Sequence, residues 1–228
     1  GIVAAPDQYF LEKNIDAYNE AEQYFLRPFY TASGRYESGE QENYIFYISD
    51  KNFGAKDIKD YPNIERHFKP FEKILKQAKE KYGTPGKRFF YLHRERKEEF
   101  FSRGSKIVCG VRVSFPSFFY TEDPYYGSRA LNFIRTDRIN LKYLSGILNS
   151  KISYFWLKNK GKQLGDLLQI DKGPLLEIPI CLGDEKQQQQ VIGLVDKILE
   201  LYKKLSETEK DSNAWHRLKE LDMLRLLA

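Results

Sequence analysis

The chain has 228 residues, 41% of them hydrophobic and 30% charged, which is ordinary for a soluble protein with one large domain or one domain plus a small helical appendage. Only two cysteines occur, with no second pair for a metal knuckle or a disulfide framework, so a cytoplasmic location is expected. No apolar run is long enough to span a bilayer and no signal-peptide pattern opens the chain. Because the first residue is Gly1 rather than Met, the chain is interpreted as part of a longer polypeptide.

The N-terminal half is expected to form short strands followed by one helix. Residues 44–48, Tyr-Ile-Phe-Tyr-Ile, are rich in β-forming side chains and predict a buried strand. Residues 57–82 place apolar side chains three or four positions apart, with Pro62 suited to the first turn, and predict a helix. The Gly-Thr-Pro-Gly turn at 83–86 is expected to end it.

The middle of the chain is richer in β-forming residues. Aromatic and β-branched side chains between turn signals predict strands at 88–92, 106–113, 117–120 and 130–134. Asn140 is expected to cap a helix that ends at Gly161, and residues 175–180 are expected to form a short strand.

The C-terminal part is expected to be a helical hairpin. Asp184 begins a helix with Val191, Val195 and Ile198 on one stripe, and a second helix is expected from Trp215. The apolar face of this hairpin is too large to stay exposed to water, so we expect it to pack against another surface. The sequence therefore predicts an α+β fold, with a mixed or antiparallel sheet packed by helices over residues 1–182 and a helical extension over 183–228.

Charge is unevenly distributed along the chain. Residues 87–162 hold 16 Lys and Arg against 6 Asp and Glu, an excess of +10, whereas the net charge of the whole chain is +5. A basic block beside a mildly acidic remainder indicates one face for a polyanion. A charged surface that only contacts water explains the same count, so charge alone leaves both interpretations open.

Signatures of catalysis are weak. No Gly-rich phosphate loop, nucleophile elbow or paired metal-ligand spacing occurs, and the three histidines are scattered at 67, 93 and 216. The acid-x-Lys spacing of a metal-dependent nuclease occurs at 57–59 and 95–97, but such triplets arise by chance in a chain this rich in charge. No catalytic residue, metal site or cofactor is predicted within the chain.

The basic block supplies the residue types that read DNA. The guanidinium group of arginine can form two hydrogen bonds to guanine, and lysine binds phosphate groups. Tyrosine can pack on sugars or unstacked bases. For the tyrosine pair a packed loop is an equal alternative. For the lysines the preference of cations for helix C-termini is a strong alternative. The predicted DNA-binding residues are Arg94, Arg96, Arg112, Ser114, Tyr125, Tyr126, Arg129, Lys158, Lys160 and Lys162.

Several segments, in this order, resemble the TaqI-like C-terminal specificity domain of adenine-specific DNA methyltransferases and type IIG restriction–modification enzymes. They are Lys-Ile-Val at 106–108, Phe-Phe-Tyr at 118–120, Tyr-Leu-Ser-Gly-Ile-Leu-Asn-Ser-Lys at 143–151 and Glu-Ile-Pro-Ile at 177–180. Segments 26–29, 44–48, 61–64 and 88–94 match upstream, so the resemblance extends over residues 1–205. Many relatives carry another proline where this chain has Cys181. The backbone geometry directly after the Ile-Pro segment is therefore not predicted.

The resemblance implies a module that binds double-stranded DNA and selects the site. It also implies an upstream domain of the same polypeptide that binds S-adenosylmethionine and methylates adenine at N6 through an Asn-Pro-Pro-Tyr/Phe motif, which this chain lacks. The parent is then an enzyme, with or without a fused endonuclease. Two alternatives stay open: half of a type I specificity subunit, and a helical protein-interaction module with incidental basic charge.

Overall fold

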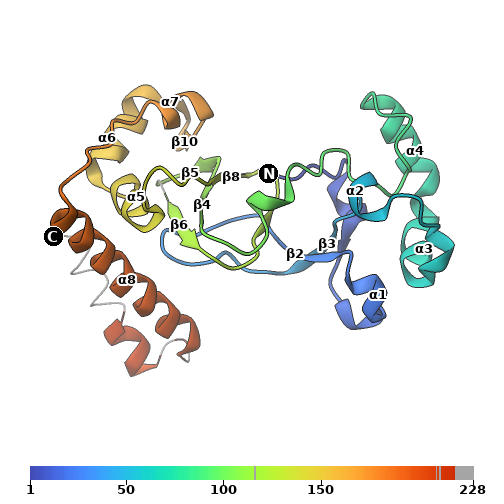
Figure 1. Cartoon of the computed structure of the whole chain (residues 1–228), viewed down its shortest axis with the longest axis horizontal. Coiled ribbons are helices and arrows are strands. Elements are labelled where there is room, and N and C mark those ends of the chain that lie inside the picture. The colour runs from blue at the N-terminus through green and yellow to red at the C-terminus, as the bar shows by residue number, and fades with distance from the viewer. Residues whose placement is uncertain (116, 209, 211, 219–228) are drawn as a thin grey trace. The chain divides into compact units, whose positions relative to one another are not determined.

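The computed structural model describes residues 1–115, 117–208, 210 and 212–218, in two compact units built from interleaved segments (Figure 1). Unit 1 comprises Gly1–Thr31, Glu40–Gly104 and Asp123–Leu131, and unit 2 comprises Ala32–Gly39, Ser105–Glu122 and Asn132–Ala228. Helices and mixed or antiparallel sheets occur together, which confirms the predicted α+β class. The division predicted at residues 182/183 concerns functional parts and stays a prediction.

Unit 1 is built on a four-stranded sheet in the order β1-β3-β2-β7. Strand β2 (Leu26–Tyr30) pairs antiparallel with β3 (Asn43–Phe46) and parallel with β7 (Tyr126–Gly127), so the strand expected near residue 44 is confirmed. The other elements of this unit are β1 (Leu11–Glu12), η1 (Asp7–Phe10), η2 (Ile15–Ala17), α1 (Glu20–Gln23), α2 (Asp50–Phe53), η3 (Ile58–Asp60), α3 (Pro62–Phe68), η4 (Lys69–Phe71), α4 (Glu72–Lys81) and η5 (Glu98–Phe100).

Two predictions for unit 1 are wrong in detail. The helix expected over 57–82 is broken into η3, α3, η4 and α4, and Pro70 lies in η4 where the helix changes type. Proline lacks an amide N–H and its ring clashes with the preceding turn, so the α-helical ladder cannot continue through it. Residues 88–92 form turns rather than a strand, and Phe90, Tyr91 and Leu92 fill the aromatic core instead.

Unit 2 contains two three-stranded sheets, β6-β4-β8 and β5-β10-β9. The strand expected over 106–113 divides at Val111, and its two parts, β4 and β5, belong to different sheets, whereas the strands expected near 118 and 131 are confirmed. The elements are β4 (Lys106–Gly110), β5 (Arg112–Val113), β6 (Phe118–Thr121), β8 (Leu131–Ile134), α5 (Leu141–Leu148), α6 (Lys151–Lys160), β9 (Lys162–Leu164), β10 (Leu167–Gln169), α7 (Lys172–Leu176) and α8 (Glu185–Glu207).

The helix expected from Asn140 to Gly161 is two helices. Asn140 caps α5 as predicted, but α5 ends at Leu148, and the hydroxyl of Ser150 accepts the Ser153 amide to begin α6. Serine favours a cap because its side-chain oxygen satisfies an amide that has no helical partner. The strand expected over 175–180 is also wrong, since α7 occupies its first part and the rest is irregular.

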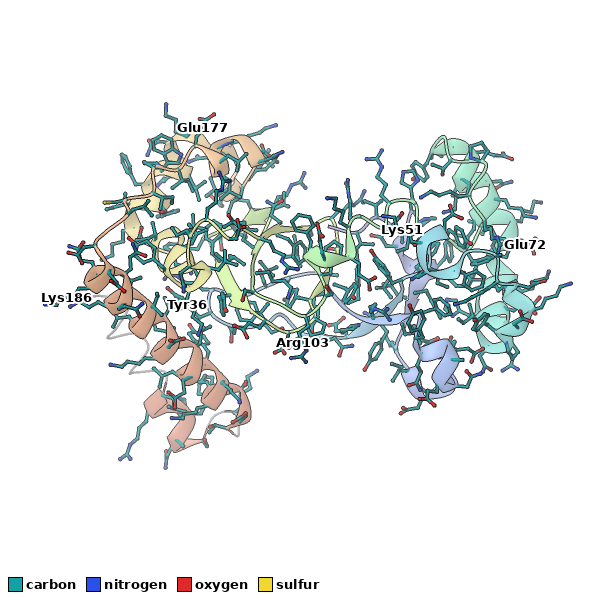
Figure 2. All side chains as sticks on the ribbon, viewed as in Figure 1. Tyr36, Lys51, Glu72, Arg103, Glu177 and Lys186 are labelled. Carbon is teal, nitrogen blue, oxygen red and sulfur yellow. The ribbon has the colours of Figure 1, made fainter. Side chains whose placement is uncertain are left out.

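Helix α8 packs against α5, and the two lie beside each other in Figure 1. The close approach depends on Gly146, because a Cβ atom there would lie only 2.7 Å from Cγ1 of Val191. An ion pair of 2.6 Å between Lys142 and Asp196 joins the same helices. Further along α8, the ring of Tyr202 lies 6.1 Å from that of Tyr36, which is labelled in Figure 2.

The start of α8 confirms the helix predicted from Asp184, whose side chain accepts the Gln187 amide in a capping box. Residues 213–218 are helical, and the rest of the expected second helix, including Leu221, Leu224 and Leu227, lies outside the described residues. Within the described part of the chain, no helix is both long and apolar enough to cross a membrane.

Candidate nucleic-acid interface

The predicted DNA-binding residues are divided between the units, and each group is described within its own unit. Unit 1 holds Arg94, Arg96, Tyr125, Tyr126 and Arg129, and unit 2 holds Arg112, Ser114, Lys158, Lys160 and Lys162. All eight residues other than the tyrosines are exposed.

The two tyrosines are core residues, which corrects their predicted role as DNA contacts. Tyr125 is 2% exposed and stacks on Tyr30 with ring centroids 3.9 Å apart. Tyr126 is 3% exposed, and its hydroxyl donates to Glu98 at 2.7 Å and accepts from Arg27. Burial against neighbouring rings leaves no face for a sugar or base, so the packed loop is what the structure shows.

The sheet β5-β10-β9 brings two predicted cations into one row. Arg112 pairs in register with Gln169, and Gln169 pairs with Lys162 on its other side. Residues opposite one another in a sheet point to the same face, and neighbouring strands lie about 5 Å apart. Arg112, Gln169 and Lys162 therefore form a row about 10 Å long.

The row lies on the outer face of this sheet. The alternate register positions hold Val113 and Leu168, and Leu168 is 5% exposed within the core of unit 2. Because successive side chains of a strand point to opposite faces, the row points away from that core. The side chains of Arg112 and Lys162 have no hydrogen bond or ion pair to other described residues, and the amide of Gln169 donates to Asp171 at 2.8 Å.

The strands β9 and β10 form a hairpin with a two-residue loop, Gly165 and Asp166. Gly165 has φ of +62°, a conformation that favours glycine and suits the first position of such a turn. Leu164 and Leu167, which face each other next to the loop, are exposed. The outer face of the hairpin therefore carries Lys162 and Gln169 and, next to the loop, the exposed Leu164 and Leu167.

Ser114 and Lys158 lie apart from this row, at a hollow of about 220 Å³ between the hairpin and α6. Tyr154 lines the same hollow and stacks on Phe115 with ring centroids 4.6 Å apart. Lys160 lies over the ring of Trp156 at 5.8 Å. The structure therefore places the cations of unit 2 at neighbouring but distinct positions.

In unit 1, Arg94 and Arg129 line one cavity of about 440 Å³. The N-terminal segment lies between them, because Val3 forms a β-bridge with Arg94 and Ile2 forms a β-bridge with Ser128, next to Arg129. Arg96 is separate from this cavity and has φ of +65°, which is uncommon for a side chain with a Cβ atom. The hydroxyl of Tyr47 donates to the backbone oxygens of residues 95 and 96 at 3.0 and 3.3 Å and supports this conformation.

Sequence reasoning missed two residues at these positions. His93 was treated as a scattered histidine, yet it lines the cavity with Arg94 and Arg129. Gln169 was not considered, because its place in the row depends on pairing with a strand more than fifty positions away. The position of His93 directly before Arg94 could have indicated its role. No local sequence pattern indicates the place of Gln169.

Comparisons with known proteins identify the fold. The sequence pattern described as the TaqI-like C-terminal specificity domain matches residues 34–180. A structure of the type IIL restriction–modification enzyme MmeI in complex with DNA superposes with a TM-score of 0.64 at 14% identity, over 94% of this chain and 28% of that enzyme. The type IIG restriction endonuclease BpuSI gives a TM-score of 0.48 at 12% identity, over 90% and 26%. No curated protein sequence matches.

Proposed function

Since the chain belongs to the TaqI-like C-terminal specificity domain family, we propose that it recognises specific sequences in double-stranded DNA for a restriction–modification enzyme. The chain spans 28% of MmeI, so the activity of the parent belongs to this proposal as well. MmeI was solved in complex with DNA, which supports DNA as the partner.

The observation that carries the proposal is the row of Arg112, Gln169 and Lys162 on the outer face of the sheet β5-β10-β9. Its length of about 10 Å fits the major groove, which is about 12 Å wide and admits a β-ribbon. Arginine reads guanine and glutamine reads adenine through paired hydrogen bonds, and lysine bonds guanine or a phosphate. The hydrogen bond from Gln169 to Asp171 restricts the amide, as a base-reading group requires.

The parent enzyme is proposed to be an N6-adenine DNA methyltransferase, with or without an endonuclease. Its target adenine has to leave the stack before methylation, at a cost of a few kcal/mol. A recognition domain that binds the duplex on either side of the adenine offsets this cost through its own contacts with the DNA. S-adenosylmethionine belongs to the methyltransferase domain in this scheme, and no residue of this chain is assigned to it.

DNA binding by the intact parent should weaken steeply with salt, because lysines and arginines release counterions from the phosphates they contact. Each contacted phosphate contributes a slope of about −0.9 to a plot of log affinity against log salt concentration. We expect a total slope steeper than about −3, measured by fluorescence anisotropy with a labelled duplex.

A double variant tests which lysines contribute to that slope. Replacing Lys158 and Lys160 with alanine should make the slope shallower by about 2, one for each lost phosphate contact. The matched control replaces Lys186 and Lys197, two exposed lysines of α8, and should leave the slope unchanged (Lys186 is labelled in Figure 2). A flat salt dependence of the wild-type parent would contradict the proposed function.

A further inference from the structure

The cavity of unit 1 is lined by side chains that can donate hydrogen bonds and by part of the N-terminal segment. It is lined by His93, Arg94, Arg129, Tyr82, Gln8 and Asp7, together with Val3, Ala5 and Pro6 of the N-terminal segment. The segment is held by hydrogen bonds of 2.9 to 3.3 Å between Val3 or Ala4 and residues 93–94. Asp7 accepts the amides of Ala4 and Ala5 through one carboxylate oxygen, which keeps the turn closed.

Positive charge around this cavity exceeds negative charge. The side chains of Arg94 and Arg129 form no hydrogen bond or ion pair with the described residues, so both guanidinium groups retain all their donors. Nearby Lys87 pairs with Glu95 at 3.3 Å, and buried Lys79 donates to the backbone oxygen of Tyr91. Burial, and secondarily the charge of Lys87, lower the pKa of Lys79 to about 8.

His93 is the titratable group of the cavity. One ring nitrogen, Nδ1, lies 3.4 Å from the hydroxyl of Thr84, and the ring lies 5.4 Å from that of Tyr82. Burial is the main cause that lowers the pKa of His93, and Arg94, Lys79, Lys87 and Arg96 lower it further in that order. Burial and the neighbouring cations thus both favour the neutral imidazole.

We propose that this cavity binds a phosphate group, held by the guanidinium groups of Arg94 and Arg129 with His93 as a third donor. Arginine forks match the tetrahedral oxygens of phosphate, and such charge-assisted bonds are among the strongest in proteins. A bound phosphate would offset the repulsion from the neighbouring cations and favour the protonated imidazole, so binding takes up a proton onto His93. The cavity of about 440 Å³ also leaves space for the remainder of a phosphate-bearing ligand.

This site goes beyond DNA recognition, because inorganic phosphate, a phosphate monoester and a DNA backbone phosphate all present the same oxygens. The probes are therefore inorganic phosphate and sulfate, compared with chloride at matched ionic strength. Sulfate keeps its charge over the range of histidine titration, about pH 5 to pH 8, so any pH dependence of its binding comes from the protein.

The test follows the histidine resonances of the full chain by NMR, which is practical because only three histidines occur. Sulfate and phosphate should raise the pKa of His93 by about 1 or more, and sulfate affinity should increase as pH falls. Replacing both Arg94 and Arg129 with glutamine should lower sulfate affinity at least about tenfold. The control Arg66→Gln, on the exposed surface of α3, should keep the wild-type affinity.

The source of the phosphate is separated by adding a DNA duplex to the same sample. A duplex that moves the His93 resonance as sulfate does identifies the DNA backbone as the ligand, whereas a response to inorganic anions alone identifies a free phosphate compound. Both outcomes support the site. The proposal is overturned when sulfate and phosphate move His93 no more than chloride does, a result that leaves recognition through the Arg112 row untouched.

Discussion

Under the proposed function, replacing Arg112 with alanine should change which DNA sites the intact parent methylates, while the fold stays the same. The side chain is exposed and has no partner among the described residues, so its loss should alter the free energy of unfolding by less than about 0.5 kcal/mol. A lost bidentate contact to guanine should cost about 1–3 kcal/mol at one base position, roughly 5- to 150-fold in discrimination. Sequencing of methylated DNA from cells that carry each variant measures the effect.

Two matched variants make this result specific. Lys160→Ala should weaken methylation at all sites alike, because a phosphate contact carries no sequence information. Arg138→Ala removes another exposed arginine of unit 2, which lies outside the sheet β5-β10-β9, and should leave the set of methylated sites unchanged. An unchanged set of methylated sites in the Arg112 variant would remove this residue from the reading surface.

Replacing Asn149 with alanine should cost unit 2 about 3 kcal/mol of stability. Asn149 is 4% exposed, and its amide group accepts the backbone N–H of Phe118 at 3.0 Å and donates to the backbone oxygen of Phe118 at 2.9 Å. Ser145 also donates to that oxygen at 2.8 Å, so the carbonyl keeps one partner in the variant while the buried N–H loses its acceptor. A buried polar group without a partner costs about 1–3 kcal/mol, and the lost bond to the carbonyl adds to this.

Urea unfolding of the full chain, followed by circular dichroism, measures the loss. The control is Asn159→Ala, because Asn159 is exposed on α6 and, among the described residues, its side chain bonds only to the backbone oxygen of Phe155 in its own helix. That change should stay within about 0.5 kcal/mol. A loss below about 1 kcal/mol for the Asn149 variant would show that the side-chain clamp between α5 and β6 is not important for stability.

This clamp explains why the sequence motif around Asn149 is informative. The Leu-Asn-Ser-Lys segment combines the end of α5, the amide clamp on β6 and the Ser150 cap of α6 within four residues. Asn149 and Ser150 each act through a specific side-chain hydrogen bond, which makes this segment the most specific part of the resemblance, although the order of all the segments carries it. The same residues also break the predicted helix, which apolar periodicity alone could not reveal since both helices carry apolar stripes.

Local patterns predicted the strands β3, β6 and β8 and the start of α8, because alternation and capping residues act within a few positions. They could not predict that the loop with Tyr125 and Tyr126 would be buried, since the cover comes from Tyr30 and Phe101, distant in sequence. The aromatic rings that were expected to meet DNA instead stabilise unit 1.

The candidate site was predictable in composition but not in arrangement. Basic residues from 87 to 162 appear as one block in the sequence, yet they belong to two units because the chain passes between the units several times. The row of Arg112, Gln169 and Lys162 requires the register of three strands, and the cavity of Arg94 and Arg129 requires the N-terminal segment between them. Both arrangements depend on tertiary pairing.

The central claim is that the outer face of the sheet β5-β10-β9 lies in the DNA groove. Photo-crosslinking of the intact parent tests it directly, with a photoreactive residue in place of Lys162 or, separately, of Gln163, the next residue on the same strand. Lys162 is on the outer face, whereas the exposed Gln163 pairs in register with Leu168 on the other face and lines the hollow where Lys158 is proposed to contact phosphate rather than bases. Position 162 should crosslink to bases within the methylated site and position 163 far less, whereas equal yields, or none from position 162, would contradict the claim.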